Sequence, residues 1–194
     1  MEKTNVSLDK VTMGSFILCP FLVVAKDSSK KSGVNIATIS YVSVLNQDDP
    51  VIGLAIRKTR HTHGLIKQAG EFTLNLPAMD QLAIIDYCGT NLFSGKKVDK
   101  ANELKLDLEK SQAISTPRIK DSPINLECRL KMVLTLSTKP RAHDFFIADV
   151  VACHRIKGFL IENHFGIVTT NYSYRMLGDT IGMAYQVHKK VLKE

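Results

Sequence analysis

The stretch between Asn35 and Thr62 combines residue types that could bind a flat, phosphorylated ligand. Small and hydroxyl side chains recur in residues 35–40 (Asn-Ile-Ala-Thr-Ile-Ser), where a plain core strand would carry bulky ones. Gly53 and Ala55 repeat this feature on one face of the next strand-like segment. Small side chains let a planar ring lie close to the backbone, whose N–H and C=O groups can then hydrogen-bond to its edge.

A basic segment follows directly. Arg57–Thr62 (Arg-Lys-Thr-Arg-His-Thr) supplies three cations and several hydroxyl donors, and a helix capped by Thr62 is predicted to run to Ala69. The unpaired N–H groups of a helix start attract anions, so this point could hold a phosphate. A planar ring site beside a phosphate site describes FMN. The competing interpretation is an exposed basic turn after an ordinary strand.

Other site chemistries have weaker support. His61 and His63 could form two metal ligands, but no third ligand lies nearby in the sequence, so we predict no metal site. The four cysteines are widely spaced and contain no C-x-x-C pair, which disfavours both a zinc site and a disulfide framework. We also find no pair of residues that forms an activated nucleophile and its base.

Length and composition predict one domain over residues 1–194. The chain is 44% hydrophobic and 23% charged, which is enough apolar content for one sizeable core. The apolar run Phe16–Ala25 is interrupted by Cys19 and Pro20 and is far shorter than the roughly 20 residues of a membrane span. We therefore expect a cytoplasmic protein with no membrane partner.

The net charge of +7 favours an anionic partner. One such class is a nucleic-acid-binding β-barrel, which would display aromatic residues interleaved with Lys and Arg for base stacking. The chain has no Trp, and its 5 Tyr and 8 Phe do not follow that arrangement. We therefore expect a phosphorylated small molecule rather than a nucleic acid.

Alternating apolar and polar residues predict a mainly β protein. The expected strands are Ser15–Ala25, Asn35–Leu45, Val51–Lys58, Glu71–Leu76, Leu126–Ser137 and Phe145–His154. In Leu126–Ser137, every second residue from Leu126 to Leu136 is apolar, which predicts one apolar face. Helices are expected only at Thr62–Ala69 and Met79–Tyr87. Consecutive strands without a helix between each pair favour a closed antiparallel barrel over a doubly wound sheet.

An ordered set of short motifs resembles the flavin-reductase-like family of FMN-binding split barrels, with flavoredoxins as its most similar branch. The resemblance covers roughly residues 12 to 180. The motifs are Asn-Ile-Ala-Thr-Ile-Ser (35–40), Asp-Pro-Val-Ile-Gly-Leu-Ala-Ile (49–56), Thr62 with Ile66, Gly-Glu-Phe-Thr-Leu-Asn-Leu-Pro (70–77), Ser94-Gly95, Val98-Asp99-Lys100, residues 122–128, and Tyr174 with Leu177-Gly178.

The resemblance implies a six-stranded antiparallel split β-barrel of Greek-key type with short helical insertions. It also implies a homodimer that binds one FMN per subunit, in which Tyr174 and residues 178–182 reach across to the partner. It assigns the isoalloxazine ring to Asn35, Ala37, Thr38, Ile39 and Ser40. It assigns the ribityl chain and phosphate to Ala55, Ile56, Arg57, Lys58 and Thr62, with Asn75 and Lys100 as additional contacts.

In such a protein FMN would accept electrons from NADH, NADPH or a protein partner and pass them to a small-molecule or protein acceptor. His143 is the expected catalytic residue, because the family keeps a histidine in the region linked to nicotinamide binding. Here Arg141 and Ala142 precede it, where many family members carry Gly-Asp. We therefore predict an NAD(P)H-dependent flavin reductase-like oxidoreductase, with a non-enzymatic FMN-binding carrier or flavin-binding protein as the alternative.

Overall fold

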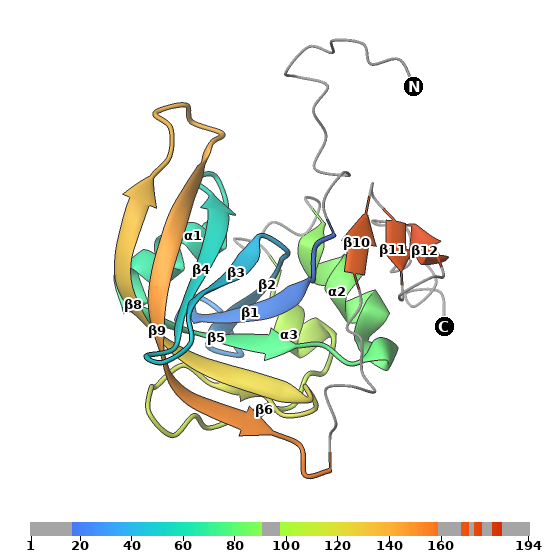
Figure 1. The fold of residues 1–194 in the computed structure, drawn as a ribbon. Coiled ribbons are helices and arrows are strands. Elements are labelled where there is room, and N and C mark those ends of the chain that lie inside the picture. Colours follow the sequence, from blue (N-terminus) through green and yellow to red (C-terminus); the bar gives the residue numbers. More distant parts are fainter. Residues whose placement is uncertain (1–16, 91–97, 159–167, 171–172, 176–179, 184–194) are drawn as a thin grey trace, which may run out of the picture.

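Seven antiparallel strands form the main sheet of the computed structural model, which describes residues 17–90, 98–158, 168–170, 173–175 and 180–183 (Figure 1). The strands are β1 (Phe21–Lys26), β2 (Val34–Ile39), β3 (Val42–Asn46), β4 (Val51–Arg57), β5 (Glu71–Leu76), β8 (Ile124–Thr135) and β9 (His143–Arg155), in the order β2-β1-β5-β8-β9-β4-β3. Two small sheets accompany it: β6 (Leu108–Glu109) with β7 (Arg118–Ile119), and β10 (Val168–Thr170), β11 (Ser173–Arg175) and β12 (Thr180–Met183).

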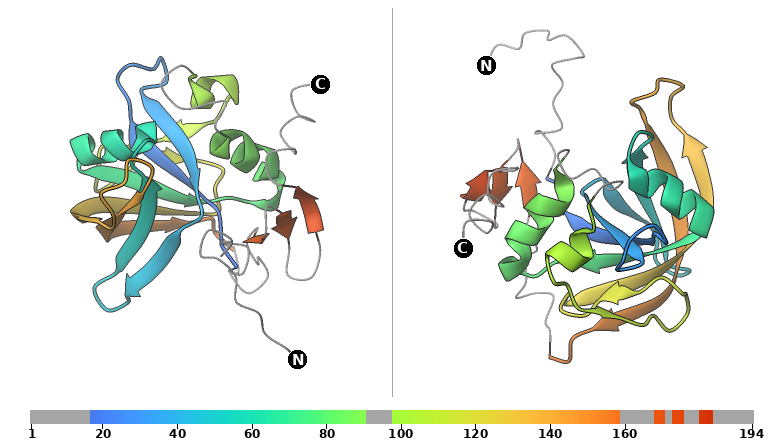
Figure 2. Two further views of the ribbon diagram at one scale, coloured as in Figure 1. Left: turned by 90° about the horizontal axis from the view of Figure 1, so that it is seen from above. Right: turned by 180° about the vertical axis from the view of Figure 1, so that it is seen from behind.

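The sheet closes on itself because its two edge strands are consecutive in the chain. β2 and β3 lie at opposite ends of the strand order, yet only Ser40 and Tyr41 separate them. The curvature that brings these edges together is visible in both views of Figure 2. The predicted mainly β, antiparallel barrel is therefore confirmed.

The strand count differs from the predicted six, because the expected strand Asn35–Leu45 is two strands. β2 pairs with β1, and β3 pairs with β4, where Ser43 lies opposite Gly53. At Ser40 and Tyr41 the chain leaves one partner for the other, and the Tyr41 carbonyl accepts a hydrogen bond from Ala55 N–H at 2.9 Å. Because only two residues separate β2 from β3, the sequence pattern resembles that of one strand.

Two other predicted boundaries need correction. The first strand begins at Phe21 rather than Ser15, after Pro20, which has no N–H for a sheet hydrogen bond; residues 15 and 16 lie outside the described residues. The helix expected to start with Thr62 as its cap is α1 (His61–Ala69), whose cap residue is Arg60. The Thr62 side chain is buried inside the first turn and accepts a hydrogen bond from Asn35 instead.

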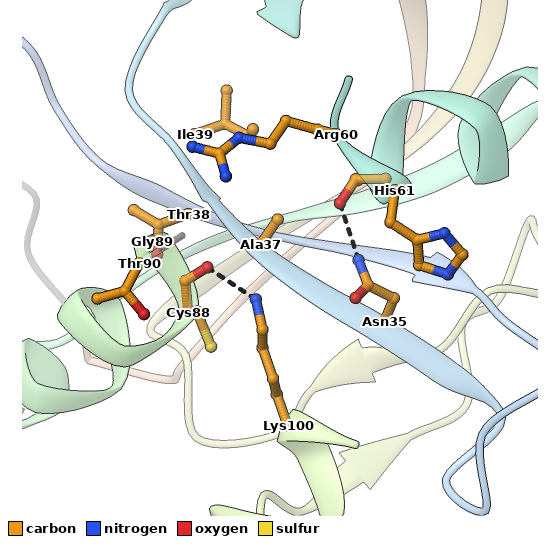
Figure 3. Close-up of a pocket in the computed structure, with 11 residues that line it drawn as sticks. Asn35, Ala37, Thr38, Ile39, Arg60, His61, Cys88, Gly89, Thr90 and Lys100 are labelled. Atoms are coloured by element: carbon orange, nitrogen blue, oxygen red, sulfur yellow. Dashed lines mark hydrogen bonds between the residues drawn. The ribbon is translucent and has the colours of Figure 1, made fainter. Parts of the chain in front are cut away.

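Two apolar clusters make up the core. Ile52, Leu54 and Ile56 of β4 are buried inside the barrel with Phe72 and Phe146. The second cluster packs α2 (Leu82–Gly89) and α3 (Lys100–Glu103) against β1 and β2. A short 3-10 turn, η3 (Met79–Gln81), leads into α2. The start of α1, the end of α2 and α3 therefore all lie around β2 (Figure 3). None of the helices in the described ranges is long and apolar enough to span a membrane.

The single apolar face predicted for Leu126–Ser137 is wrong, because an extra residue interrupts the alternation of β8. The register with β9 shifts twice: the first shift leaves Val151 of β9 without a partner, and the second leaves Lys131 of β8 without one. A bulge adds an extra residue and moves the following side chains to the opposite face. Leu126, Cys128 and Leu130 therefore pack on the core, whereas Met132 and Leu134 are 48% and 44% exposed.

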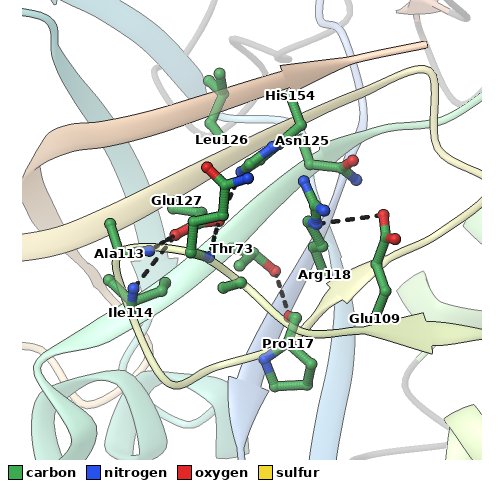
Figure 4. A network of polar contacts seen from close by, with 12 residues as sticks. Thr73, Glu109, Ala113, Ile114, Pro117, Arg118, Asn125, Leu126, Glu127 and His154 are labelled. Atoms are coloured by element: carbon green, nitrogen blue, oxygen red, sulfur yellow. Dashed lines mark hydrogen bonds and ion pairs between the residues drawn. The ribbon is translucent and has the colours of Figure 1, made fainter.

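A buried carboxylate holds the loop between β6 and β7 against the sheet. Glu127 is fully buried and accepts backbone N–H bonds from Gln112 at 2.7 Å and Ala113 at 2.6 Å (Figure 4). Ile114 N–H and His154 Nε2 also contact this carboxylate, at 3.2 and 2.7 Å. Burial raises the pKa of Glu127, but these hydrogen bonds lower it by more, so the pKa lies below its ordinary value of 4.5.

Replacing this carboxylate tests its contribution to stability. Glu127→Gln should lower the free energy of unfolding by about 3 kcal/mol, because backbone N–H groups lose a buried charged acceptor. Because the folded-state pKa is lowered, the charge contributes fully above pH about 4.5 and less as the pH falls through the folded value. Urea unfolding at pH 7 and pH 3.5 should therefore show a smaller difference between wild type and variant at the lower pH.

The matched control is Glu109→Gln. This side chain is 38% exposed and pairs with Arg118 at 3.2 Å, so its loss should cost less than about 1 kcal/mol. Equal losses in the two variants would show that Glu127 is not the anchor of the loop.

Candidate cofactor-binding site

An open pocket lies where β2, the start of α1, the end of α2 and α3 meet (Figure 3). It therefore adjoins the part of β2 whose small residues drew attention in the sequence. The lining residues are Asn35, Ala37, Thr38, Ile39, Arg60, His61, Thr62, Cys88, Gly89, Thr90 and Lys100.

β2 supplies one wall, and Asn35 on it carries an unpaired polar atom. Its side-chain N–H₂ donates to Thr62 Oγ1 at 2.8 Å, while Oδ1 is buried without a hydrogen-bond partner among the described residues. Whichever way the amide is turned, only one end meets Thr62. Buried polar atoms are nearly always satisfied, so a ligand hydroxyl or N–H at this position would complete the site.

The start of α1 supplies a second wall that suits an anion. Its cap residue Arg60 has extended backbone and makes no side-chain cap hydrogen bond within the described chain, and the first turn has no acidic residue. His63 N–H bonds to the Arg60 carbonyl at 3.1 Å, and the helix dipole favours a negative charge at this end of the helix.

Two cations extend toward the pocket from opposite sides. Arg60 extends over β2 toward Ile39, and Lys100 rises from α3 to donate to the Cys88 carbonyl at 3.0 Å (Figure 3). Lys100 is only 4% exposed. Burial, together with the positive charges of Arg60 and Lys30, lowers its pKa. An anion placed between Arg60 and Lys100 would relieve both the burial cost and the repulsion.

The end of α2 closes the back of the pocket. Thr38 Oγ1 donates to the Ile85 carbonyl at 2.6 Å, which ties β2 to this helix. A Cβ on Gly89 would lie 3.4 Å from Thr38 Cβ, which is an ordinary van der Waals contact, so this end of α2 packs directly against β2. Burial raises the pKa of the Cys88 thiol to about 12, which keeps it protonated and unreactive at neutral pH.

The structure brings together about half of the predicted site. Asn35, Ala37, Thr38, Ile39, Thr62 and Lys100 line the pocket. The others lie elsewhere: Ser40 follows β2, Ala55 and Ile56 lie within β4, Arg57 is exposed at its end, and Lys58 and Asn75 have internal partners. In the sequence, Arg60 is notable only as part of the basic segment, His61 also as a possible metal ligand, and nothing singles out Cys88, Gly89 and Thr90.

Lys58 and Asn75 have clear internal roles. Lys58 Nζ donates to the Ser137 carbonyl and lies 3.5 Å from Asp144 Oδ1, so its charge is already partnered. The Asn75 side chain is fully buried and bonds to the Leu22 carbonyl at 2.9 Å and to Asn125 Nδ2 at 2.8 Å. Both residues stabilise the barrel itself.

The three histidines near this end of the barrel have different surroundings. His61 Nε2 lies 2.7 Å from Asp27, and His63 Nε2 lies 2.9 Å from Asp144, so the two rings meet carboxylates from different elements. His143 starts β9 opposite Arg57, with its ring centre 5.4 Å from that of Tyr41. Burial and the charges of Arg57 and Arg60 lower the pKa of His143, so its imidazole is neutral at pH 7.

Comparison with known proteins places this site in context. The sequence model of the family described as "Flavin reductase like domain" matches residues 13–176. An uncharacterized protein of Archaeoglobus fulgidus is 32% identical over 117 residues, which is 60% of this chain. The match spans 63% of that relative, just under two thirds of its length.

Solved structures agree on the fold. A flavoredoxin from Methanosarcina acetivorans matches with a TM-score of 0.77 at 26% identity, covering 98% of this chain and 100% of that one. An FMN-binding protein from Thermus thermophilus, with bound p-hydroxybenzaldehyde, matches with a TM-score of 0.74 over 88% of this chain and 92% of that one. At 21% sequence identity, this similarity establishes a shared fold and no shared function.

The pocket predicts which arginine meets a ligand phosphate. Arg60→Ala should weaken FMN binding about 10- to 100-fold, because a charge-assisted hydrogen bond contributes about 1.5–3 kcal/mol. Riboflavin, which lacks the phosphate, should be affected far less. Titration of the apoprotein, followed by quenching of flavin fluorescence, measures both. Arg57→Ala is the matched control, and a larger loss there than at Arg60 would contradict this assignment.

Proposed function

The chain belongs to the flavin reductase-like family, and we propose that it binds FMN non-covalently and acts as an oxidoreductase through it. The observation that carries this proposal is the pocket itself. It joins an unpaired amide end on Asn35, a helix start without an acidic residue, and the two cations Arg60 and Lys100. Those are the groups that a ribityl chain and a terminal phosphate require.

The residues present fit FMN in complementary ways. The α1 start, Arg60 and Lys100 would hold the phosphate, and the free end of the Asn35 side chain would meet a ribityl hydroxyl. Ala37 and Gly89 also line the pocket, and small residues of this kind would let a planar ring approach the backbone. When bound, FMN would supply the redox chemistry. It can accept two electrons from a nicotinamide and can give them up one or two at a time.

We propose that NADH or NADPH is the electron donor and that His143 helps to shape its site. Its neutral imidazole can accept or donate one hydrogen bond without adding charge, and Arg57 lies opposite it in the sheet. Arg57 is exposed and is free to meet a nucleotide phosphate at this end of the barrel. The alternative is a flavoredoxin-like carrier that is reduced by a protein partner.

Rapid anaerobic mixing separates these two functions. The FMN-loaded protein should lose its flavin absorbance band within seconds on mixing with NADH or NADPH. His143→Ala should slow the reduction about 10-fold or more at saturating FMN, because the nicotinamide is then poorly placed. If dithionite bleaches the band and neither nicotinamide does, the reductase assignment fails and the carrier remains.

We also propose a homodimer, formed through an outer apolar face of the barrel. This face consists of Leu45, Met132, Leu134 and Phe145, on strands β3, β8 and β9. Leu134 pairs with Phe145, and a Cβ on Gly53 would lie 2.2 Å from the Phe145 ring and 3.0 Å from Leu45. The exposed fractions of Leu45, Met132 and Leu134 are 44%, 48% and 44%.

Grouped exposed apolar side chains of this kind mark interaction surfaces. A second copy is the partner that the family resemblance implies. Tyr174, the residue expected to reach across, lies in β11 opposite Gly182, and residues 178 and 179 of the expected contact region lie outside the described residues.

Light scattering tests this interface. The wild-type protein should have twice the 21.6 kDa mass of one chain, and Leu134→Lys should shift it toward the single-chain mass, because a charge would be buried between the copies. Met79→Lys, which also replaces an exposed apolar residue but lies on η3, should leave the mass unchanged. A single-chain mass for the FMN-loaded wild type would contradict the dimer.

A further inference from the structure

We propose that the turn between β1 and β2, residues 27–33, positions the two cationic walls of the pocket and thereby sets its preference for a phosphorylated flavin. The proposal rests on the proposed FMN site. Its observation is that hydrogen bonds near both ends of this turn reach the two elements that carry the pocket cations. Asp27 reaches α1 beside Arg60, and Ser32 reaches the residue before Lys100.

The first tie joins the turn to the start of α1. Asp27 is 4% exposed, and its carboxylate accepts from Ser29 N–H at 3.1 Å and Ser29 Oγ at 2.6 Å. The same carboxylate lies 2.7 Å from Nε2 of His61, the first residue of α1. Burial raises the pKa of Asp27, but the bonds from Ser29 and His61 lower it by more, so it is ionised at neutral pH and the tie persists.

The second tie joins the turn to α3. Ser32 donates twice to Asp99, from Oγ at 2.6 Å and from N–H at 2.8 Å. Asp99 also caps α3 by accepting from Asn102 N–H at 3.2 Å. The following residue is Lys100, so the position of its backbone depends on this contact. Burial raises the pKa of Asp99, but the Ser32 and Asn102 bonds lower it by more, so Asp99 is also ionised at neutral pH.

The turn between these ties is internally braced. Asp27 N–H bonds to the Gly33 carbonyl at 2.8 Å, and Gly33 N–H bonds to the Lys30 carbonyl at 3.0 Å. Gly33 has a φ of +74°, a conformation that favours glycine. These bonds keep Asp27 and Ser32 at a fixed distance from each other, and therefore hold the start of α1 and the start of α3 at a fixed distance as well.

A fixed separation matters because the two walls repel each other. The charge of Arg60 lowers the pKa of the buried Lys100, and α3 has only four residues with which to resist movement. Without the hydrogen bonds between Ser32 and Asp99, the ammonium group of Lys100 would lower its electrostatic free energy by moving toward water and away from Arg60. Held in place, the two cations favour a dianionic phosphate over the neutral hydroxyl end of riboflavin.

A double-mutant cycle tests this role. Ser32→Ala should weaken FMN binding about 5- to 10-fold, the loss expected for one hydrogen bond, and change riboflavin binding less than about twofold. In a Lys100→Met background the same substitution should have little further effect on FMN, because the residue it positions is gone. Asp99→Asn should reproduce the Ser32→Ala result. Ser28→Ala, an exposed serine of the same turn, is the matched control.

The outcomes are distinct. Equal losses of FMN and riboflavin, or a full additional loss in the Lys100→Met background, would overturn the positioning role and leave the FMN site intact. Unchanged FMN affinity in Ser32→Ala would overturn it as well. Failure of the wild-type protein to bind FMN would overturn both this inference and the proposed function. Circular dichroism confirms that each variant is folded, and Ser32→Ala alone suffices if Asp99→Asn unfolds.

Discussion

The joining of the two edges of the sheet by a two-residue connection is the constraint on which the rest of the structure depends. Because β2 continues into β3 through Ser40 and Tyr41, the strand with small side chains must lie near the end of β4, the partner of β3. α1 follows β4 directly, so its first turn is brought against β2. The hydrogen bond between Asn35 and Thr62 is the local result, and the pocket forms at this junction.

Electrostatics then decide which charged groups face that pocket. The chain is basic overall, yet several of its carboxylates are used inside the protein: Glu127 holds a loop, Asp144 meets His63 and Lys58, and Asp27 and the half-buried Asp99 hold the turn. The cations that line the pocket, Arg60 and Lys100, have no carboxylate among the residues that line it with them. The anionic ligand proposed for this pocket would therefore add the negative charge that the lining lacks.

The bulge of β8 at Lys131 determines which side chains reach the outer surface. By moving Met132 and Leu134 off the core side, it leaves apolar side chains on the outside of the barrel beside Phe145. Glu127 keeps the regular alternation between Leu126 and Cys128, and it is buried on the opposite face because the loop of Gln112, Ala113 and Ile114 covers its carboxylate. A barrel strand that curves strongly needs such bulges, and they determine which of its side chains remain available to a partner.

The sequence by itself determined the local elements. Alternation identified β4, β5, β8 and β9, the basic segment with the following apolar spacing located α1, and the small residues of 35–40 marked the pocket wall. These features depend on neighbours a few residues apart, which periodicity and propensity describe directly. The ordered motifs also sufficed to identify the family that the comparisons confirm.

Only the tertiary structure decided which side chains of those elements reach the site. Arg57 and Arg60 are residues of the same type in the same basic segment. Arg57 lies exposed at the end of β4, whereas Arg60 lies at the start of α1 and lines the pocket. Lys58 is partnered by Asp144 from β9, and the carboxamide of Asn75 is used by β1 and β8. Such pairings join residues far apart in the sequence, so the physical reason is that closure of the barrel, rather than local spacing, sets the contacts of each side chain.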